Sequence, residues 1–69
     1  MANYFKQQAF ISEAKRRHAP WRVSDLARSL SMSIRTAYRY LDQAERIGGF
    51  RFVIHQSDDG RVVLYSLEA

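Results

Sequence analysis

The stretch Val23–Leu41, VSDLARSLSMSIRTAYRYL, decides how this chain folds. It holds two short helical patterns separated by a three-residue break. The first pattern has apolar residues at helical spacing, namely Val23, Leu26, Ala27 and Leu30. Ser24 is expected to cap this helix, and Asp25 behind it suits the positive end of the helix dipole. We therefore expect a short helix from about Ser24 to Leu30.

The break is Ser31-Met32-Ser33, and a second helix is predicted after it, from about residue 34 to residue 47. Ser33 is its expected N-cap. Apolar residues then share one side of the second helix: Ile34, Ala37, Leu41, Ala44 and Ile47. Met32 is expected to fill the gap between the two helices. The small side chain of Ala27 is expected to let the second helix approach the first closely. A helix, a tight turn and a second helix make a helix-turn-helix unit.

The segment before this unit predicts one more helix. Asn3 is its expected cap, and it runs to about Arg17 with Phe10, Ile11 and Ala14 as the core set. Pro20 ends it, because proline cannot continue a helix. The residues that follow, Trp21 to Val23, are expected to form a short extended segment with Trp21 in or beside the core.

The segment after the unit predicts a β-hairpin. Gly48-Gly49 ends the long helix with a left-handed glycine, and Phe50 to Gln56 and Arg61 to Leu67 read as strands around a turn. One buried face is expected: Phe50, Phe52, Ile54, Val63, Tyr65 and Leu67. A four-residue loop with Gly60 left-handed pairs Ile54 with Val63, and a two-residue Asp59-Gly60 turn pairs it with Tyr65 instead. The sequence leaves both registers open.

A lone hairpin is unstable and must pack on the helices. The predicted fold class is therefore α+β, as one domain over 1–69. Three helices precede the hairpin, and a short strand is possible near Trp21–Val23.

The helix-turn-helix stretch resembles that of winged-helix regulators of the DeoR kind. The matching residues are Val23, Leu26, Ala27, Leu30, Ser33, Thr36, Ala37, Arg39 and Leu41. Ser31 departs from the pattern, because the family usually has a left-handed Gly there, a conformation that costs Ser a modest amount of energy. In such a winged helix, 34–47 is the recognition helix and the hairpin 50–67 is the wing.

The resemblance implies sequence-dependent binding of double-stranded DNA by a transcriptional regulator. It implies a cytoplasmic protein of a bacterial cell or a phage-infected host, associated with the nucleoid. Small stand-alone regulators of phages and mobile elements look similar, and whether this chain is one of them or an excised domain stays open. We expect a homodimer, at least on DNA, since one recognition helix gives a small interface. Its contact is left open between the first helix, with Phe5, and the C-terminal strand.

Composition agrees with a nucleic-acid partner and disfavours other classes. The formal charge is +4 over 69 residues, and nine of the eleven basic residues are Arg, whose planar fork suits phosphate and guanine. The chain has no cysteine, which excludes disulfides and thiolate metal sites. His18 and His55 lie in different elements without carboxylates at ligand spacing. We expect no enzyme activity, catalytic residue, cofactor, metal, small-molecule ligand or membrane segment.

The side of the second helix that lies opposite its apolar side carries the candidate DNA contacts. Arg35, Thr36 and Arg39 are the expected base readers, with Tyr38 at the margin, since the first turns of such a helix reach the base edges. The candidate phosphate contacts are Arg22, Ser24, Ser33 and Arg46 on the helices and Arg51 and Arg61 on the hairpin. The alternative interpretation is a solvated face on which Asp42 pairs with Arg39 and Arg46.

Two other functions use the same fold. One is a different DNA role, as an excisionase or a replication or packaging factor. The other is a winged helix used only for contact with proteins. Titration of duplex DNA at two salt concentrations separates the latter, because a protein-binding module has no steeply salt-dependent affinity for DNA.

Overall fold

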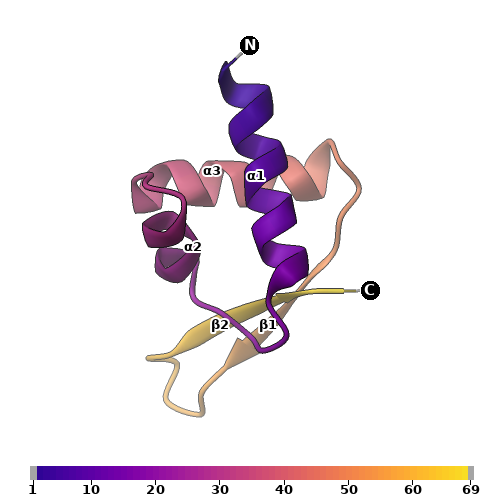
Figure 1. Ribbon diagram of the computed structural model, residues 1–69. Coiled ribbons are helices and arrows are strands. Elements are labelled where there is room, and N and C mark those ends of the chain that lie inside the picture. The colour runs from indigo at the N-terminus through magenta and orange to yellow at the C-terminus, as the bar shows by residue number, and fades with distance from the viewer. Residues whose placement is uncertain (1, 69) are drawn as a thin grey trace.

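The computed structural model describes residues 2–68, with the side chains of residues 6–68. Three helices come first: α1 (Ala2–Arg16), α2 (Val23–Ser29) and α3 (Ile34–Arg46). An antiparallel hairpin of β1 (Phe52–Gln56) and β2 (Val63–Leu67) follows them (Figure 1). The predicted α+β class is confirmed, and the arrangement is consistent with a winged helix. No helix within the described range is long and apolar enough to cross a membrane.

Two expected helix caps are wrong. α2 begins one residue earlier than expected, and its cap is Arg22, whose backbone N–H donates to Asp25 Oδ2 at 3.0 Å. An acidic residue three positions after the cap closes the first turn in this way, which leaves Ser24 inside that turn. Asn3 likewise lies within α1. The expected extended segment shrinks to Trp21, which forms an isolated bridge with Tyr65.

The turn between α2 and α3 has the predicted form. Met32 N–H donates to the Ala27 carbonyl at 2.9 Å and Ser31 N–H to the Arg28 carbonyl at 3.3 Å. This is the Schellman pattern, which needs a left-handed residue just past the helix, and Ser31 takes that conformation with φ of 55°. Ser33 then caps α3, because its Oγ accepts from Thr36 N–H at 3.1 Å.

The core lies between the three helices and the base of the hairpin. Its largest fully buried side chains are Trp21, Tyr40, Phe10 and Leu26. The other buried apolar residues complete it: Ile11, Ala14, Val23, Ala27, Ala37, Leu41 and Ala44. The core set predicted for α1 is confirmed. The side chain of Phe5 lies outside the described residues.

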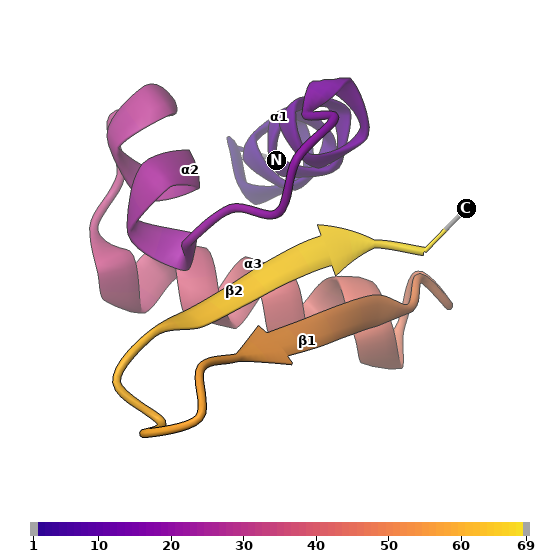
Figure 2. The same ribbon diagram turned by 90° about the horizontal axis from the view of Figure 1, so that it is seen from below.

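Trp21 joins the helical core to the hairpin. Its ring lies edge-on to Phe10, with centroids 6.2 Å apart, and stacks on Tyr65 at 5.8 Å. The backbone N–H of Trp21 donates to the Tyr65 carbonyl at 2.8 Å, and the backbone N–H of Tyr65 donates to the Trp21 carbonyl at 2.7 Å. These two bonds hold β2 against the segment that leads into α2, as Figure 2 shows.

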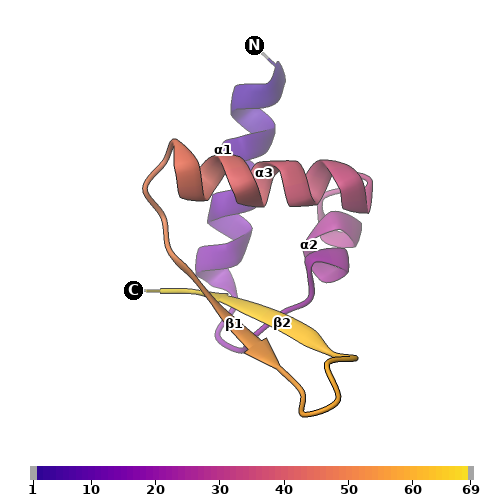
Figure 3. The same cartoon turned by 180° about the vertical axis from the view of Figure 1, so that it is seen from behind.

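The hairpin has the second of the two registers, with Ile54 opposite Tyr65. Its connection is longer than a two-residue turn: the last cross-strand bond runs from Ser57 N–H to the Val62 carbonyl at 2.9 Å, and Gly60 N–H then donates to the Ser57 carbonyl at 2.9 Å. Gly60 is left-handed, with φ of 73°. The expectation that Ile54 is buried is wrong, since 61% of it is exposed. The tip of the hairpin projects beyond the helices (Figure 3), and the hairpin residues that pack against the core lie at its base: Phe50, Phe52, Tyr65 and Leu67.

Candidate nucleic-acid interface

The helix that follows the tight turn separates its apolar and charged sides. Its buried side consists of Ala37, Tyr40, Leu41 and Ala44. The opposite side consists of Arg35, Arg39, Asp42 and Arg46, all exposed, and is called here the arginine face of α3. Because the buried side is fully used in the core, this face is the one that α3 presents to the outside.

Only part of this face is neutralised by ion pairs. Arg46 Nε lies 3.0 Å from Asp42 Oδ1, and both side chains are more than half exposed. Such a solvated pair contributes a few tenths of a kcal/mol to stability. Within the described side chains, Arg35 and Arg39 form no ion pair. The arginine face therefore carries two unpaired guanidinium groups in the first half of α3 and a paired one near its end.

Two hydroxyl groups lie at the start of α3. Ser33 Oγ accepts the cap bond from Thr36 N–H, and its hydroxyl donates to Thr36 Oγ1 at 2.9 Å. Thr36 lies in the first turn of α3 and is half-buried, so it is less accessible than the residues of the arginine face. Free backbone N–H groups and a positive dipole end make such a terminus favourable for an anion.

A hollow of about 270 Å³ gathers four of the predicted contact residues from separate parts of the chain. Arg22 and Ser24 come from the start of α2, Tyr38 from α3 and Arg61 from the hairpin. Ile34, 52% exposed, also lines it and was assigned from sequence only to the apolar side of α3. Its spacing of four residues from Tyr38 is the signal that could have placed both on one patch.

Arg61 lies beside a carboxylate that stabilises the turn. Its Nε is 3.7 Å from Asp59 Oδ2, and its backbone N–H donates to Asp59 Oδ1 at 3.0 Å. Hydrogen bonds from the Ser57 hydroxyl and from Arg61 N–H hold the pKa of Asp59 below its ordinary value. The tip of the hairpin therefore carries both signs of charge, and the carboxylate offsets part of the attraction that Arg61 has for a phosphate.

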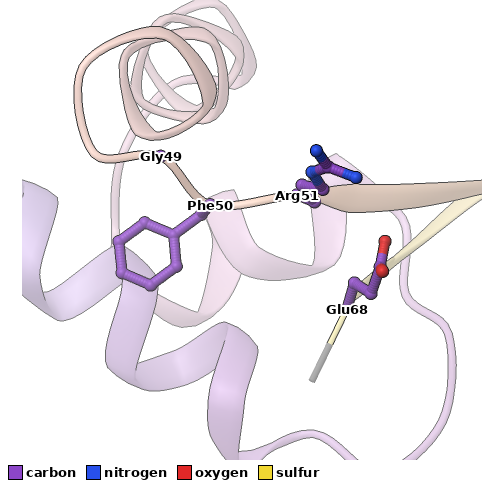
Figure 4. A pocket seen from close by; sticks show the side chains of 4 residues that line it. All are labelled: Gly49, Phe50, Arg51 and Glu68. Atoms are coloured by element: carbon purple, nitrogen blue, oxygen red, sulfur yellow. The ribbon is translucent and has the colours of Figure 1, made fainter.

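Arg51 lies apart from the hollow, at the base of the hairpin. It lines a different depression, of about 230 Å³, with Gly49, Phe50 and Glu68. In Figure 4 the side chains of Arg51 and Glu68 lie on neighbouring chain segments, and the Phe50 ring points to the other side. Arg51 is therefore separate from the hollow that Arg22, Ser24, Tyr38 and Arg61 line, and Arg46 is the last residue of α3.

Within residues 2–68, no group of three His, Asp or Glu side chains is placed to hold a metal ion. Comparisons with protein-family models, with curated proteins and with solved structures find no match. A function for this chain is therefore inferred from its own geometry and charge.

Proposed function

We propose that this protein binds double-stranded DNA in a sequence-dependent way and acts as a transcriptional regulator. In this proposal α3 enters the major groove, and the hairpin lies beside it as a wing. The supporting observation is the pair Arg35 and Arg39, both exposed and without an ion pair among the described side chains. They stand on the helix that follows a tight turn, on the side opposite the core.

The chemistry of these two residues suits base reading. An arginine fork donates two parallel hydrogen bonds to O6 and N7 of a guanine, the commonest specific contact in the major groove. The groove admits one helix, and the first turns of that helix usually reach the bases. Arg35 and Arg39 occupy the first and second turns of α3, and Tyr38 lies next to them, 49% exposed.

The hollow supplies a complementary site for the DNA backbone. Arg22 and Arg61 line it together with the hydroxyl-bearing residues Ser24 and Tyr38. Cations and hydroxyl groups that reach phosphate oxygens orient a protein on the duplex without reading its sequence. The formal charge of +4 favours the same partner.

The first experiment selects bound sequences from a random duplex pool and then measures variants on the selected site. Arg39→Ala and Arg35→Ala should each weaken binding to that site by about 1–3 kcal/mol and relax one base preference. Arg28→Ala is the matched control, because it removes the same charge from an exposed position on α2. Equal losses on selected and random DNA would show that the two α3 arginines contact only phosphates.

The wing and the competing functions are tested on the same material. Arg61→Ala should lower affinity alike on all sequences, and unchanged binding would remove the wing from the proposal. Affinity for generic duplex DNA should fall steeply between two salt concentrations. A flat response would favour a winged helix that contacts only proteins. Bound sites that lie away from promoters would favour an excisionase or a replication or packaging factor.

A further inference from the structure

The two edges of the hairpin differ in what covers them. β2 is flanked by β1 on one side and by Trp21 on the other, through the two backbone bonds of Trp21 with Tyr65. Within residues 2–68 no segment pairs with the other edge of β1. Figure 2 shows this free edge on the side of the hairpin that faces away from α1 and α2.

The backbone groups that point outward from β1 can be identified. Arg51 and Ser57 are hydrogen-bonded to the β2 side, through Glu68 N–H to the Arg51 carbonyl and Ser57 N–H to the Val62 carbonyl. Successive residues of an antiparallel strand alternate between the two edges. The N–H and C=O groups of Phe52, Ile54 and Gln56 therefore point away from β2, towards the free edge.

β1 lacks the usual protection of an exposed edge. Natural proteins block such edges with charged residues, proline or a bulge, because an open edge pairs with other strands. The strand FVIHQ contains no Lys, Arg, Asp, Glu or Pro, and its five residues pair with β2 without interruption. Val53 is 39% exposed and Ile54 61%. This edge therefore carries two exposed apolar side chains and none of these blocking features.

We propose that β1 pairs with β1 of a second copy of this chain, antiparallel and about a two-fold axis at Ile54. In this register Ile54 stands opposite Ile54 of the second copy, and Phe52 stands opposite Gln56. These are the residues whose backbone groups point outward, so each N–H and C=O gains a partner. The two hairpins then form one four-stranded sheet in which the exposed Ile54 side chains cover each other.

Charge favours the antiparallel direction over the parallel one. Arg51 directly precedes β1 and Asp58 is the second residue after it, and neither forms an ion pair within the described side chains. Antiparallel pairing brings the Arg51 end of one copy to the Asp58 end of the other, twice. Parallel pairing would place like charges together at both ends, which is destabilising.

The size of the edge sets the strength of the association. A stable interface buries about 800 Å² on each partner, far more than a five-residue strand edge offers. The pairing is therefore weak in solution and becomes strong only where something else holds two copies together. It does not require the proposed DNA binding, and the test below contains no DNA, so failure of one is separate from failure of the other.

The first test is cross-linking by a single cysteine in a chain that has none of its own. Directly opposite residues of a hydrogen-bonded antiparallel pair have Cα atoms about 5.5 Å apart, within the range that a disulfide spans. Ile54→Cys should therefore form a disulfide-linked dimer in a glutathione redox buffer. Because Ile54 is 61% exposed, its replacement leaves the core intact, and circular dichroism checks that the variant is folded.

Two controls separate this register from random collision. Val53→Cys is a neighbour on the same strand, but its counterpart in the second copy is offset by two residues, beyond about 7 Å and the reach of a disulfide. The second control is Ile47→Cys, because Ile47 is 81% exposed and lies outside the hairpin. Ile54→Cys should cross-link about tenfold faster than either control, because pairing raises its effective concentration. Equal rates, or no dimer from Ile54→Cys, would overturn the proposal.

A second measurement uses the chain without cysteine. Sedimentation of the unsubstituted protein should show weak, concentration-dependent dimerisation. Ile54→Lys should abolish it by placing two ammonium groups opposite each other, whereas Ile47→Lys should leave it unchanged. A protein that stays monomeric at millimolar concentration, or a dimer that tolerates Ile54→Lys, contradicts pairing through β1.

Discussion

Replacing Ser31 by Gly should stabilise the protein, because Ser31 is the one non-glycine residue with positive φ among those described. Its φ of 55° lies in the left-handed region. That conformation costs an L-residue about 1–2 kcal/mol, and glycine adopts it without strain. Two hydrogen bonds hold Ser31 in this conformation, since the Schellman bonds of Ser31 and Met32 both require the chain to turn back at this point.

The expected gain is the difference between two opposing effects. Relief of strain stabilises the folded state by about 1–2 kcal/mol. The greater freedom of glycine stabilises the unfolded chain by about 0.4–1 kcal/mol. Ser31→Gly should therefore raise the free energy of unfolding by about 0.5–1 kcal/mol, with both backbone bonds kept. In a domain of this size, 1 kcal/mol corresponds to about 4–8 °C in Tm.

The assay is urea unfolding followed by the fluorescence of Trp21, the only tryptophan in the chain. Only 2% of Trp21 is exposed in the folded protein, so unfolding moves its ring from the core into water. The control is Ser29→Gly, an exposed position at the end of α2 with helical backbone. It should lower stability by about 0.5 kcal/mol, because glycine is the poorer helix former. Ser31→Gly no more stable than the original chain, beside a normal loss for Ser29→Gly, would refute the strain argument.

Two further predictions concern α1 and the helix interface. Glu13 accepts hydrogen bonds from Arg16 Nη2 at 2.7 Å and Arg17 Nε at 3.1 Å, and the Arg16 bond is the main cause that holds its pKa below 4.5. A lowered pKa favours the ionised form in the folded state. The resulting stabilisation is complete above about pH 4.5 and is lost as the pH falls through the lowered pKa. Glu13→Gln should remove this part of the pH dependence of stability, measured by urea titrations from acid to neutral pH. An unchanged pH profile in the variant would contradict this role of Glu13. Ala37→Leu should lower the free energy of unfolding by about 1–3 kcal/mol through overpacking, because Ala37 is 0% exposed. The control Ala9→Leu, at an exposed position of α1, should change stability little. Similar shifts in Tm for the two variants would show that the α3 interface has room for a larger side chain.

Local patterns in the sequence were sufficient for most of the architecture. The spacing of apolar residues placed α2 and α3, and the Ser33 cap was correct because capping depends on residues only three positions apart. The same locality explains the error at the start of α2. Ser24 is a good cap by residue type, but Arg22 with Asp25 three residues later forms the competing first turn.

The candidate site could be predicted in part. The wheel of α3 placed Arg35 and Arg39 opposite the core, and their exposure follows from that period alone. The partner of Asp42 could not be chosen from sequence, because Arg39 and Arg46 both stand at helical spacings from it. The structure pairs it with Arg46.

What the sequence by itself determined is the set of elements and the side of α3 that stays free, because each depends on a period of a few residues. Only the tertiary structure decided what those elements do together. The bridge from Trp21 to Tyr65 fixes where the hairpin lies, and so brings Arg22, Tyr38 and Arg61 to one hollow. It also covers one edge of the sheet and leaves Ile54 and the edge of β1 open. The alternation of residues in a strand predicts which side chains share a face. It does not predict how far the neighbouring helices extend along that face, and this extent decides which of those side chains are buried.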